Sequence, residues 1–542
     1  MSATLNSDSP LLHRLHANAE CFPGRAALLG DTEAFTYGEL LQVVTGIAAE
    51  LKARNLNVVG LFANNGPRWL LVDLACQLAG VALVPLPAFF SPQQLLHTVR
   101  TSGLQALITD SPEYFVDTPG FGTGEACAGM TLLPWDLAQL KALDEEAQPG
   151  KSLPAETAKV TFTSGSTGTP RGVCLSNQTQ FATAEALANS LAPLGCATHL
   201  CLLPLATLLE NVAGAYTCWL LGGTVLAPGL ERLGFSGSSQ LDMKRLCACI
   251  DEHQPESLIL LPQILKSLLE QVDEGGWQPP ASLRFVAVGG GKVSADLLRD
   301  ASGRGLPVYE GYGLSECGSV VALNLPGDAR AGTVGKPLPH CEIALRNGEV
   351  VVRGPHYLGY LGSGQDDDGE DTGDGWLATG DLGSRDSDGF LHITGRKKNI
   401  LISSYGRNIS PEWIESELLC AQSLLQCVVV GDARPYCGVL VLPRAGSDIQ
   451  QIGVWIDSVN RTLPDYARIR HWALLPQPLT FADGLLTANG RPRRECIAER
   501  YALLIERLYQ NDHFQPNKGG EPNQTSHFVP VSSTGEQTPG VA

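Results

Sequence analysis

Short apolar runs alternate with longer amphipathic stretches over the first part of the chain. Runs rich in aliphatic and β-branched residues predict strands, and stretches with polar positions at helical spacing predict helices. The predicted strands are Ala34–Thr36, Asn57–Phe62, Val81–Leu86 and Ala106–Thr109, and the predicted helices are Tyr37–Lys52, Arg68–Ala79 and Ser91–Ser102. Strands that alternate with such helices indicate a parallel, doubly wound sheet, and therefore an α/β fold.

The same alternation resumes after residue 175 and changes in character after residue 330. Further strands are predicted at Leu200–Leu203, Thr224–Leu226, Ser257–Leu261 and Leu283–Val288. Beyond them, Gly, Asp and Asn residues separate three short apolar segments, Glu342–Leu345, Val350–Arg353 and Phe390–Thr394. Short strands joined by turn residues predict an antiparallel, barrel-like sheet.

The length of the chain predicts more than one domain. Its 542 residues are too many for a single hydrophobic core, because cores stop growing at roughly 250–300 residues. A smaller α+β unit is expected from Ile400 to Gln510. The acidic, Gly-rich stretch Gly362–Gly375 is expected to be an exposed loop, and residues 511–542, rich in Pro, Gly, Ser and Thr, a disordered tail.

Composition and charge narrow the class of protein. Hydrophobic residues make up 44% and charged residues 17% of the chain, as in ordinary globular proteins. The net charge of −18 argues against binding to nucleic acid, because the chain would repel the phosphate backbone. The 15 cysteines form no CxxC pair, which favours reduced thiols over a zinc site. No signal peptide or membrane-spanning run is evident, so a cytoplasmic enzyme is expected.

The loop Thr163–Gly172 (TSGSTGTPRG) is the first candidate for chemistry. It follows the strand-like run Val160–Phe162. Glycines let successive N–H groups converge, and hydroxyls add donors, so such a loop can cradle anionic oxygens. The order of the P-loop motif is absent. On composition alone, a loop rich in Gly and Ser is more often a linker than a phosphate site.

Two further motifs combine glycines with polar groups. Tyr309–Gly318 reads YEGYGLSECG, in which a hydroxyl precedes the carboxylate of Glu316. A carboxylate beside phosphates suits Mg²⁺, although Glu316 taken alone is better explained as the cap of a turn. Val288–Lys292 (VGGGK) follows a predicted strand, and its glycines fit either a tight turn or close approach to a flat ligand.

A third, long segment gives these motifs a common context. Gly375–Glu417 reads GWLATGDLGSRDSDGFLHITGRKKNILISSYGRNISPEWIESE. Together, in this order, the motifs resemble the adenylate-forming superfamily, which includes acyl-CoA synthetases, luciferases and peptide-synthetase adenylation domains. The resemblance implies a large N-terminal domain of doubly wound sheets plus a distorted β-barrel at residues 1–397. It further implies a mobile C-terminal α+β domain at 398–510, and ATP, Mg²⁺ and CoA as cofactors.

The resemblance also assigns roles in the large domain. The phosphate loop would comprise Thr163, Ser164, Gly165, Ser166, Thr167, Gly168 and Arg171, the last standing where the family has lysine. Mg²⁺ would be held by Glu316 and Thr167, with Ser315 bonding the α-phosphate. The adenine and acyl pocket would involve Gly289, Gly290, Gly291, Tyr312 and Gly313. Asp381 would accept the ribose hydroxyls, a role that suits its two acceptor oxygens.

In the second half of the long segment and beyond, the resemblance assigns a hinge and a cation. Arg396 would approach the ribose and phosphate, Lys398 would be the hinge, and Tyr405–Gly406 would line the thiol tunnel. Leu485–Arg494 (LLTANGRPRR) has Arg491 where the family has the lysine that bonds the substrate carboxylate. Arginine is broad and planar, whereas lysine is a compact charge, so slower adenylation or a restriction to particular acids is expected. Arg493 or Arg494 is an alternative source of the charge.

Among family branches, the chain looks most similar to long-chain fatty acyl-CoA synthetases. Leu203–Gly214 (LPLATLLENVAG) has Thr207 where many relatives carry an aromatic residue or histidine. Its leucines suit an aliphatic acid, so a medium- or long-chain fatty acid is the expected substrate and CoA the acceptor. The alternatives are loading of an acyl carrier protein, closure of a β-lactone, and a nucleotide- or acyl-binding protein of low activity. Peripheral membrane contact is left open.

Overall fold

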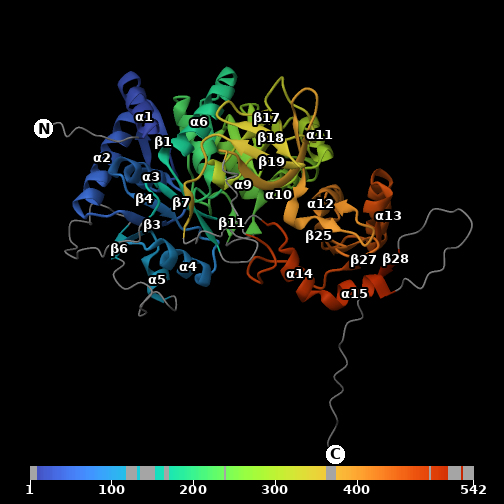
Figure 1. Ribbon diagram of the computed structural model, residues 1–542. Coiled ribbons are helices and arrows are strands. Elements are labelled where there is room, and N and C mark those ends of the chain that lie inside the picture. The colour runs from blue at the N-terminus through green and yellow to red at the C-terminus, as the bar shows by residue number, and fades with distance from the viewer. Residues whose placement is uncertain are drawn as a thin grey trace, which may run out of the picture. The chain divides into compact units, whose positions relative to one another are not determined.

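The computed structural model divides the chain into two compact units, Met1–Ile393 and Thr394–Ala542 (Figure 1). It describes residues 9–117, 131–134, 153–163, 170–236, 240–361, 374–487, 490–510 and 526–528. Most of the acidic stretch and most of the predicted tail lie outside these ranges. Each unit is described by itself.

A seven-stranded sheet carries the first half of the large unit. Its order is β20 (Gly359–Leu361), β8 (Arg171–Leu175), β7 (Lys159–Thr163), β4 (Ala82–Pro85), β3 (Val58–Phe62), β5 (Ala106–Thr109) and β6 (Thr131–Pro134). The strands from β7 to β6 run parallel, whereas β8 and then β20 are added antiparallel. The predicted doubly wound, parallel sheet is therefore confirmed.

A nine-stranded sheet carries the second half. Its order is β17 (Lys336–Pro337), β16 (Ala322–Leu323), β15 (Val308–Tyr312), β14 (Phe285–Val288), β13 (Ser257–Leu260), β9 (Thr198–Leu200), β10 (Thr224–Leu226), β1 (Ala26–Leu29) and β2 (Ala34–Thr36). The six strands from β15 to β1 are parallel, and the edges are antiparallel. A short hairpin pairs β11 (Phe235–Ser236) with β12 (Gln240–Leu241).

Helices join and cover these sheets. They are α1 (Pro10–Cys21), α2 (Tyr37–Ala53), α3 (Pro67–Ala79), α4 (Pro92–Ser102), α5 (Pro112–Asp117), α6 (Asn177–Leu191), α7 (Leu208–Glu210), α8 (Thr217–Leu220), α9 (Met243–His253), α10 (Pro262–Asp273) and α11 (Ala295–Gly303), with the π-helical turn η4 (Asn211–Tyr216) between α7 and α8. Helix α3 is buried from Trp69 to Leu78, in a core cluster that takes residues from both large sheets. The two sheets thus share one hydrophobic core.

A four-stranded sheet follows where the barrel-like sheet is predicted. It comprises β18 (Glu342–Arg346), β19 (Glu349–Arg353), β21 (Leu377–Arg385) and β22 (Leu391–Arg396), and the first three pair antiparallel.

The small unit is an α+β structure. It contains the hairpin β23 (Leu401–Ile402) and β24 (Asn408–Ile409), the sheet β25 (Leu424–Val430), β26 (Cys437–Pro443), β27 (Ile469–Leu474) and β28 (Ser526–Phe528), and the helices α12 (Pro411–Leu418), α13 (Ile449–Thr462), α14 (Arg494–Arg500) and α15 (Ala502–Gln510). Alternate residues of β25 enter opposite cores: Cys427 and Val429 pack with α12 and α13, and Val428 packs with α14 and α15. Both faces of the sheet are therefore covered.

Several elements of the structure differ from the sequence predictions. The strand predicted at Leu200–Leu203 lies earlier, at Thr198–Leu200, because the backbone amides of Leu202 and Leu203 donate to the Glu210 carboxylate instead of to a strand. Strand β21 was not predicted, because Gly380 interrupts its apolar pattern. Within the tail predicted as disordered, Ser526–Phe528 forms β28, which pairs parallel with β27.

Candidate functional site

The candidate phosphate loop joins two antiparallel strands of the seven-stranded sheet. Thr163, the last residue of β7, lies opposite Arg171, the first residue of β8. Ser164, Gly165, Ser166, Thr167 and Gly168 lie outside the described residues. The sheet thus fixes both ends of the loop, and Arg171 stands half-buried at its exit.

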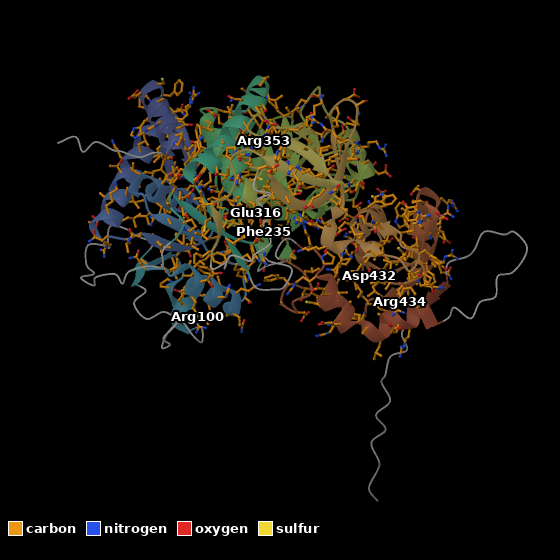
Figure 2. The ribbon with its side chains drawn as sticks, viewed as in Figure 1. Arg100, Phe235, Glu316, Arg353, Asp432 and Arg434 are labelled. Atoms are coloured by element: carbon orange, nitrogen blue, oxygen red, sulfur yellow. The ribbon has the colours of Figure 1, made fainter. Side chains whose placement is uncertain are left out.

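The motif after β15 makes a sharp reversal that requires glycine. A Cβ built on Gly313 would lie 1.6 Å from the carbonyl oxygen of Ser319. Ser315 and Glu316 then form the short helix η5 (Ser315–Cys317), where both side chains are half-buried. Figure 2 shows Glu316 toward the middle of the large unit.

Asp381 sits in a bulge of β21. Glu349 and Val351 of β19 pair with Leu382 and Ala378, so β21 has additional residues between the two pairs. Gly380 in the bulge has a φ of +70°, which favours glycine. The Asp381 amide donates to the Thr379 hydroxyl at 3.1 Å, and the Asp381 side chain is buried. The bulge therefore directs this carboxylate inward.

Hydrogen bonds connect the acidic groups to neighbouring tyrosines. The hydroxyl of Tyr312 donates to Oδ2 of Asp381 at 2.6 Å. The hydroxyl of Tyr360, from β20, donates to Oε1 of Glu316 at 2.8 Å. Among the described residues, Oε2 of Glu316 has no partner. One half-buried carboxylate oxygen of this kind fits Mg²⁺ that is bound mainly by phosphates, so Glu316 would hold the ion there.

The chain bends at the three glycines after β14, close to the leucine-rich segment. Gly290 has a φ of +77°, and a Cβ built on it would lie 2.9 Å from Cδ2 of Leu261 and 3.9 Å from Cδ2 of Leu209. The turn explanation thus accounts for Gly290. Leu209 therefore lies near Gly290, in the segment expected to line an acyl pocket.

A buried carboxyl supports the same turn. Glu310 of β15 is 3% exposed, and its Oε2 has no hydrogen-bond partner among the described residues. Burial raises the pKa of Glu310 to about 8, while Lys292 and the backbone amide of Val293 act in the opposite direction. The Nζ of Lys292 donates to the carbonyl of Ile393 at 2.7 Å. Sequence reasoning did not single out Glu310.

A buried ion pair stands at the base of the phosphate-loop strand. The Nζ of Lys159, the first residue of β7, lies 2.9 Å from Oδ1 of Asp73 on α3, and both side chains are 1% exposed. Lys159 also donates to Asn211, and Tyr216 donates to Asp73. In the sequence, Asp73 is the single acidic residue within the predicted helix Arg68–Ala79, and no local pattern links it to Lys159.

The segment carrying Thr207 is fixed by a second buried polar pair. Thr207 immediately precedes α7, where Oε2 of Glu210 accepts from the amides of Leu202 and Leu203. Its Oε1 lies 2.8 Å from Nε2 of His199. Cys201 is close enough for these three side chains to form a potential metal cluster, but both oxygens of Glu210 already make hydrogen bonds.

The remaining candidates belong to the small unit. Lys398, Gly406 and Arg491 are exposed, Tyr405 is 76% exposed, and Arg396 is half-buried. The Arg491 amide donates to the Thr487 hydroxyl at 3.1 Å.

The alternative cation Arg494 is engaged elsewhere in the small unit. It makes two bonds to the Glu415 carboxylate, at 2.9 and 2.7 Å, within the core. A buried, bidentate pair of this kind is costly to break. Arg493 donates to the carbonyl of Gly484 at 3.1 Å. Arg491 is therefore the most accessible of the three cations.

Comparison with known proteins identifies the family. The pattern of the AMP-binding enzyme family matches residues 15–361, and that of the AMP-binding enzyme C-terminal domain matches residues 398–513. The chain therefore belongs to the AMP-binding enzyme family. In the part of the chain that the structure describes, no helix is long and apolar enough to cross a membrane.

Individual relatives differ in the acid that their names specify. A long-chain-fatty-acid–CoA ligase of Mycobacterium bovis is 34% identical over 254 residues, which cover 42% of this chain and 42% of the relative. A 2-succinylbenzoate–CoA ligase of Bacillus subtilis is 28% identical over 433 residues, which cover 77% and 84%. The chain thus spans about two fifths of the fatty-acid ligase and most of the succinylbenzoate ligase.

Solved structures show the same fold. The O-succinylbenzoate CoA synthetase of Bacillus subtilis in complex with AMP has a TM-score of 0.72 at 24% identity, over 89% of this chain and 97% of that one. An anthranilate CoA ligase in complex with anthranoyl-AMP has a TM-score of 0.76 at 18% identity, over 92% and 98%.

Proposed function

We propose that the protein activates a carboxylic acid with ATP to an acyl-adenylate and transfers the acyl group to CoA. The proposal rests on one set of paired strands and hydrogen-bonded side chains in the large unit. Arg171 is the first residue of β8, and β8 pairs with β20. On β20, the hydroxyl of Tyr360 donates a hydrogen bond to the carboxylate of Glu316. Candidate groups for phosphate and for Mg²⁺ are thus held by adjacent strands. The ribose candidate Asp381 is tied to Tyr312 of the motif that contains Glu316.

In the first half-reaction, a carboxylate oxygen of the acid attacks the α-phosphorus of ATP, and pyrophosphate leaves. Mg²⁺ would neutralise charge on the phosphates when bound by Glu316 and Thr167. The loop N–H groups and Arg171 would stabilise the same charge, and Asp381 would orient the ribose. Arg491 of the small unit would bond the attacking carboxylate and bring it to near-attack distance.

In the second half-reaction, the sulfur of CoA attacks the acyl carbon, and AMP leaves with the carboxylate oxygen. Rotation of the small unit about Lys398 would withdraw Arg491 and bring in the segment Tyr405–Gly406. One site would then serve two reactions in turn. The fatty-acid and succinylbenzoate ligases both use CoA by name, which supports this acceptor.

We infer that the acid is a medium- or long-chain fatty acid. The segment from Leu203 to Leu209 is rich in leucine, and Leu209 adjoins Gly290 in the large unit. An apolar wall of this kind favours an aliphatic chain, and one relative is named for fatty acids. The succinylbenzoate ligases make an aromatic acid the competing possibility.

The test measures pyrophosphate release with ATP, Mg²⁺ and a panel of acids, and traps the adenylate with hydroxylamine. Fatty acids of graded length, succinylbenzoate and anthranilate form the panel. The proposal expects trapping that depends on ATP and is strongest with one range of fatty acids. A preference for the aromatic acids would reject the fatty-acid assignment alone, and no trapping with any acid would reject adenylation.

A second comparison tests the acceptor. Three separate reactions are run. The first contains CoA, the second an acyl carrier protein bearing phosphopantetheine, and the third a 3-hydroxy acid as substrate with no acceptor. Thioester formation with CoA is expected, whereas carrier-protein loading or β-lactone formation would replace that part of the proposal.

A further inference from the structure

Tyr360 contacts three parts of the candidate nucleotide site: strand β8, the carboxylate of Glu316 and the guanidinium of Arg171. It is the middle residue of the edge strand β20, and its register partner on β8 is Val173. The amide of Leu358, just before β20, donates to the carbonyl of Cys174 at 2.8 Å. The segment is therefore fastened to the strand that leaves the phosphate loop.

The same segment holds Glu316 at two points. The Tyr360 hydroxyl donates to Oε1 of the carboxylate at 2.8 Å, and the amide of Tyr357 donates to the Glu316 carbonyl at 2.7 Å. The Tyr357 and Tyr360 rings pack edge to face with centroids 4.9 Å apart. Because backbone and side chain are both bonded, the Glu316 carboxylate has one defined orientation, with Oε1 occupied and Oε2 directed elsewhere.

The ring of Tyr360 also contacts the residue at the exit of the phosphate loop. The guanidinium carbon of Arg171 lies 5.6 Å from the ring centroid, within the range of a cation–π contact. Arginine stacks on aromatic faces better than lysine does. Burial, and then the neighbouring Glu316, raise the pKa of Tyr360, so its hydroxyl stays protonated and remains a donor.

We propose that Tyr360 is a positioning residue of this site, whose hydroxyl orients Glu316 toward a divalent cation and whose ring seats the Arg171 guanidinium. The inference rests on the proposed function, because the cation is that of MgATP. It explains why arginine is accommodated where the family has lysine: a planar cation matches the tyrosine face. It gives Tyr360 no contact with the reacting atoms.

The test is the equilibrium binding of ATP, measured calorimetrically with Mg²⁺ and with EDTA, using the full-length protein. Wild type is expected to bind ATP more tightly with Mg²⁺. In Tyr360→Phe this Mg²⁺-dependent gain should fall about tenfold, as for loss of a hydrogen bond to a charged group, while binding in EDTA changes little. Tyr309→Phe is the matched control, because the Tyr309 ring stacks on the ring of Phe285, with centroids 5.2 Å apart.

A double-mutant cycle separates positioning from folding. In a Glu316→Gln background, Tyr360→Phe should cause no further loss of the Mg²⁺-dependent gain, whereas a fold defect would persist there. Arg171→Lys should weaken binding of ATP in wild type by more than it does in Tyr360→Phe.

The outcomes distinguish this inference from the function on which it rests. An unchanged Mg²⁺-dependent gain in Tyr360→Phe, or additive losses in the cycle, would overturn the positioning role alone. Absence of ATP binding by the wild-type protein would overturn the proposed function and this inference with it.

Discussion

The hydroxyl of Tyr312 donates a hydrogen bond of 2.6 Å to Oδ2 of Asp381. This bond joins the reversal after β15 to the bulge of β21, although its two residues are 69 positions apart in the sequence. It also uses one acceptor position of the carboxylate. A carboxylate has further lone pairs, so Asp381 can still accept from a ribose while Tyr312 holds its orientation.

Substitutions at this pair should act on ATP rather than on the acid. Tyr312→Phe is expected to raise the KM for ATP about threefold to tenfold, since it removes one hydrogen bond to a charged group. Asp381→Ala should raise that KM about a hundredfold and leave the KM for the acid nearly unchanged. Steady-state kinetics with each substrate varied in turn measures both values. Equal effects on the two KM values would contradict the ribose assignment.

Arg491 should matter in the first half-reaction and little in the second. Arg491→Ala is expected to slow adenylation about a hundredfold or more, because the attacking carboxylate loses its cation. Arg491→Lys should retain most of the activity, since it keeps the charge. The control supplies synthetic acyl-adenylate and CoA, where Arg491→Ala should act at nearly the wild-type rate. Equal losses in both assays would exclude the division of labour.

Glu310 should make stability depend on pH. Its pKa is raised from 4.5 to about 8 in the folded chain. The folded state therefore holds a proton that the unfolded chain releases, and its stability falls as pH rises from about 4.5 through about 8. Glu310→Gln keeps an acceptor for the Val293 amide and removes this titration. Chemical unfolding should show a stability advantage of the variant that is about 2 kcal/mol larger at pH 8 than at pH 6. An advantage independent of pH would show that Glu310 is charged in the folded protein.

The buried pair of Lys159 and Asp73 should be strongly coupled. Lys159→Met leaves the Asp73 carboxylate buried without its cation and should cost about 3–5 kcal/mol of unfolding free energy. The double variant Lys159→Met/Asp73→Leu should recover much of that loss, because two apolar side chains replace the pair. Arg346→Met, which removes an exposed partner of Asp374, is the control and should cost less than about 1 kcal/mol. Additive losses for Lys159 and Asp73 would contradict the coupling.

Local patterns account for most of the fold. Four consecutive residues, Ala106–Thr109, are each fully buried in β5, and this strand was predicted with its observed ends. The pattern fails in β21, because the buried alternate positions after Leu377 carry the polar residues Thr379 and Asp381. Asp381 is a candidate site residue, so the hydrophobic pattern of this strand is interrupted where it contributes to the site.

Some residues of the candidate site lie in local sequence motifs, whereas others are brought together only by the fold. Glu316, Asp381 and Arg491 are candidates because they lie in motifs that are contiguous in sequence. The ion pair of Lys159 with Asp73 joins residues 86 positions apart, and the bond of Tyr360 to Glu316 joins residues 44 apart. Both depend on which strands become neighbours, and no local pattern specifies that.

The most direct test of the central claim follows the oxygen atoms of the acid. Dodecanoate labelled with ¹⁸O in both carboxyl positions is incubated with ATP, Mg²⁺, CoA and the protein, and the products are analysed by mass spectrometry. If the carboxylate attacks the α-phosphorus, each AMP carries one ¹⁸O and the pyrophosphate carries none. Unlabelled AMP, or formation of ADP with ¹⁸O in phosphate, would contradict the account.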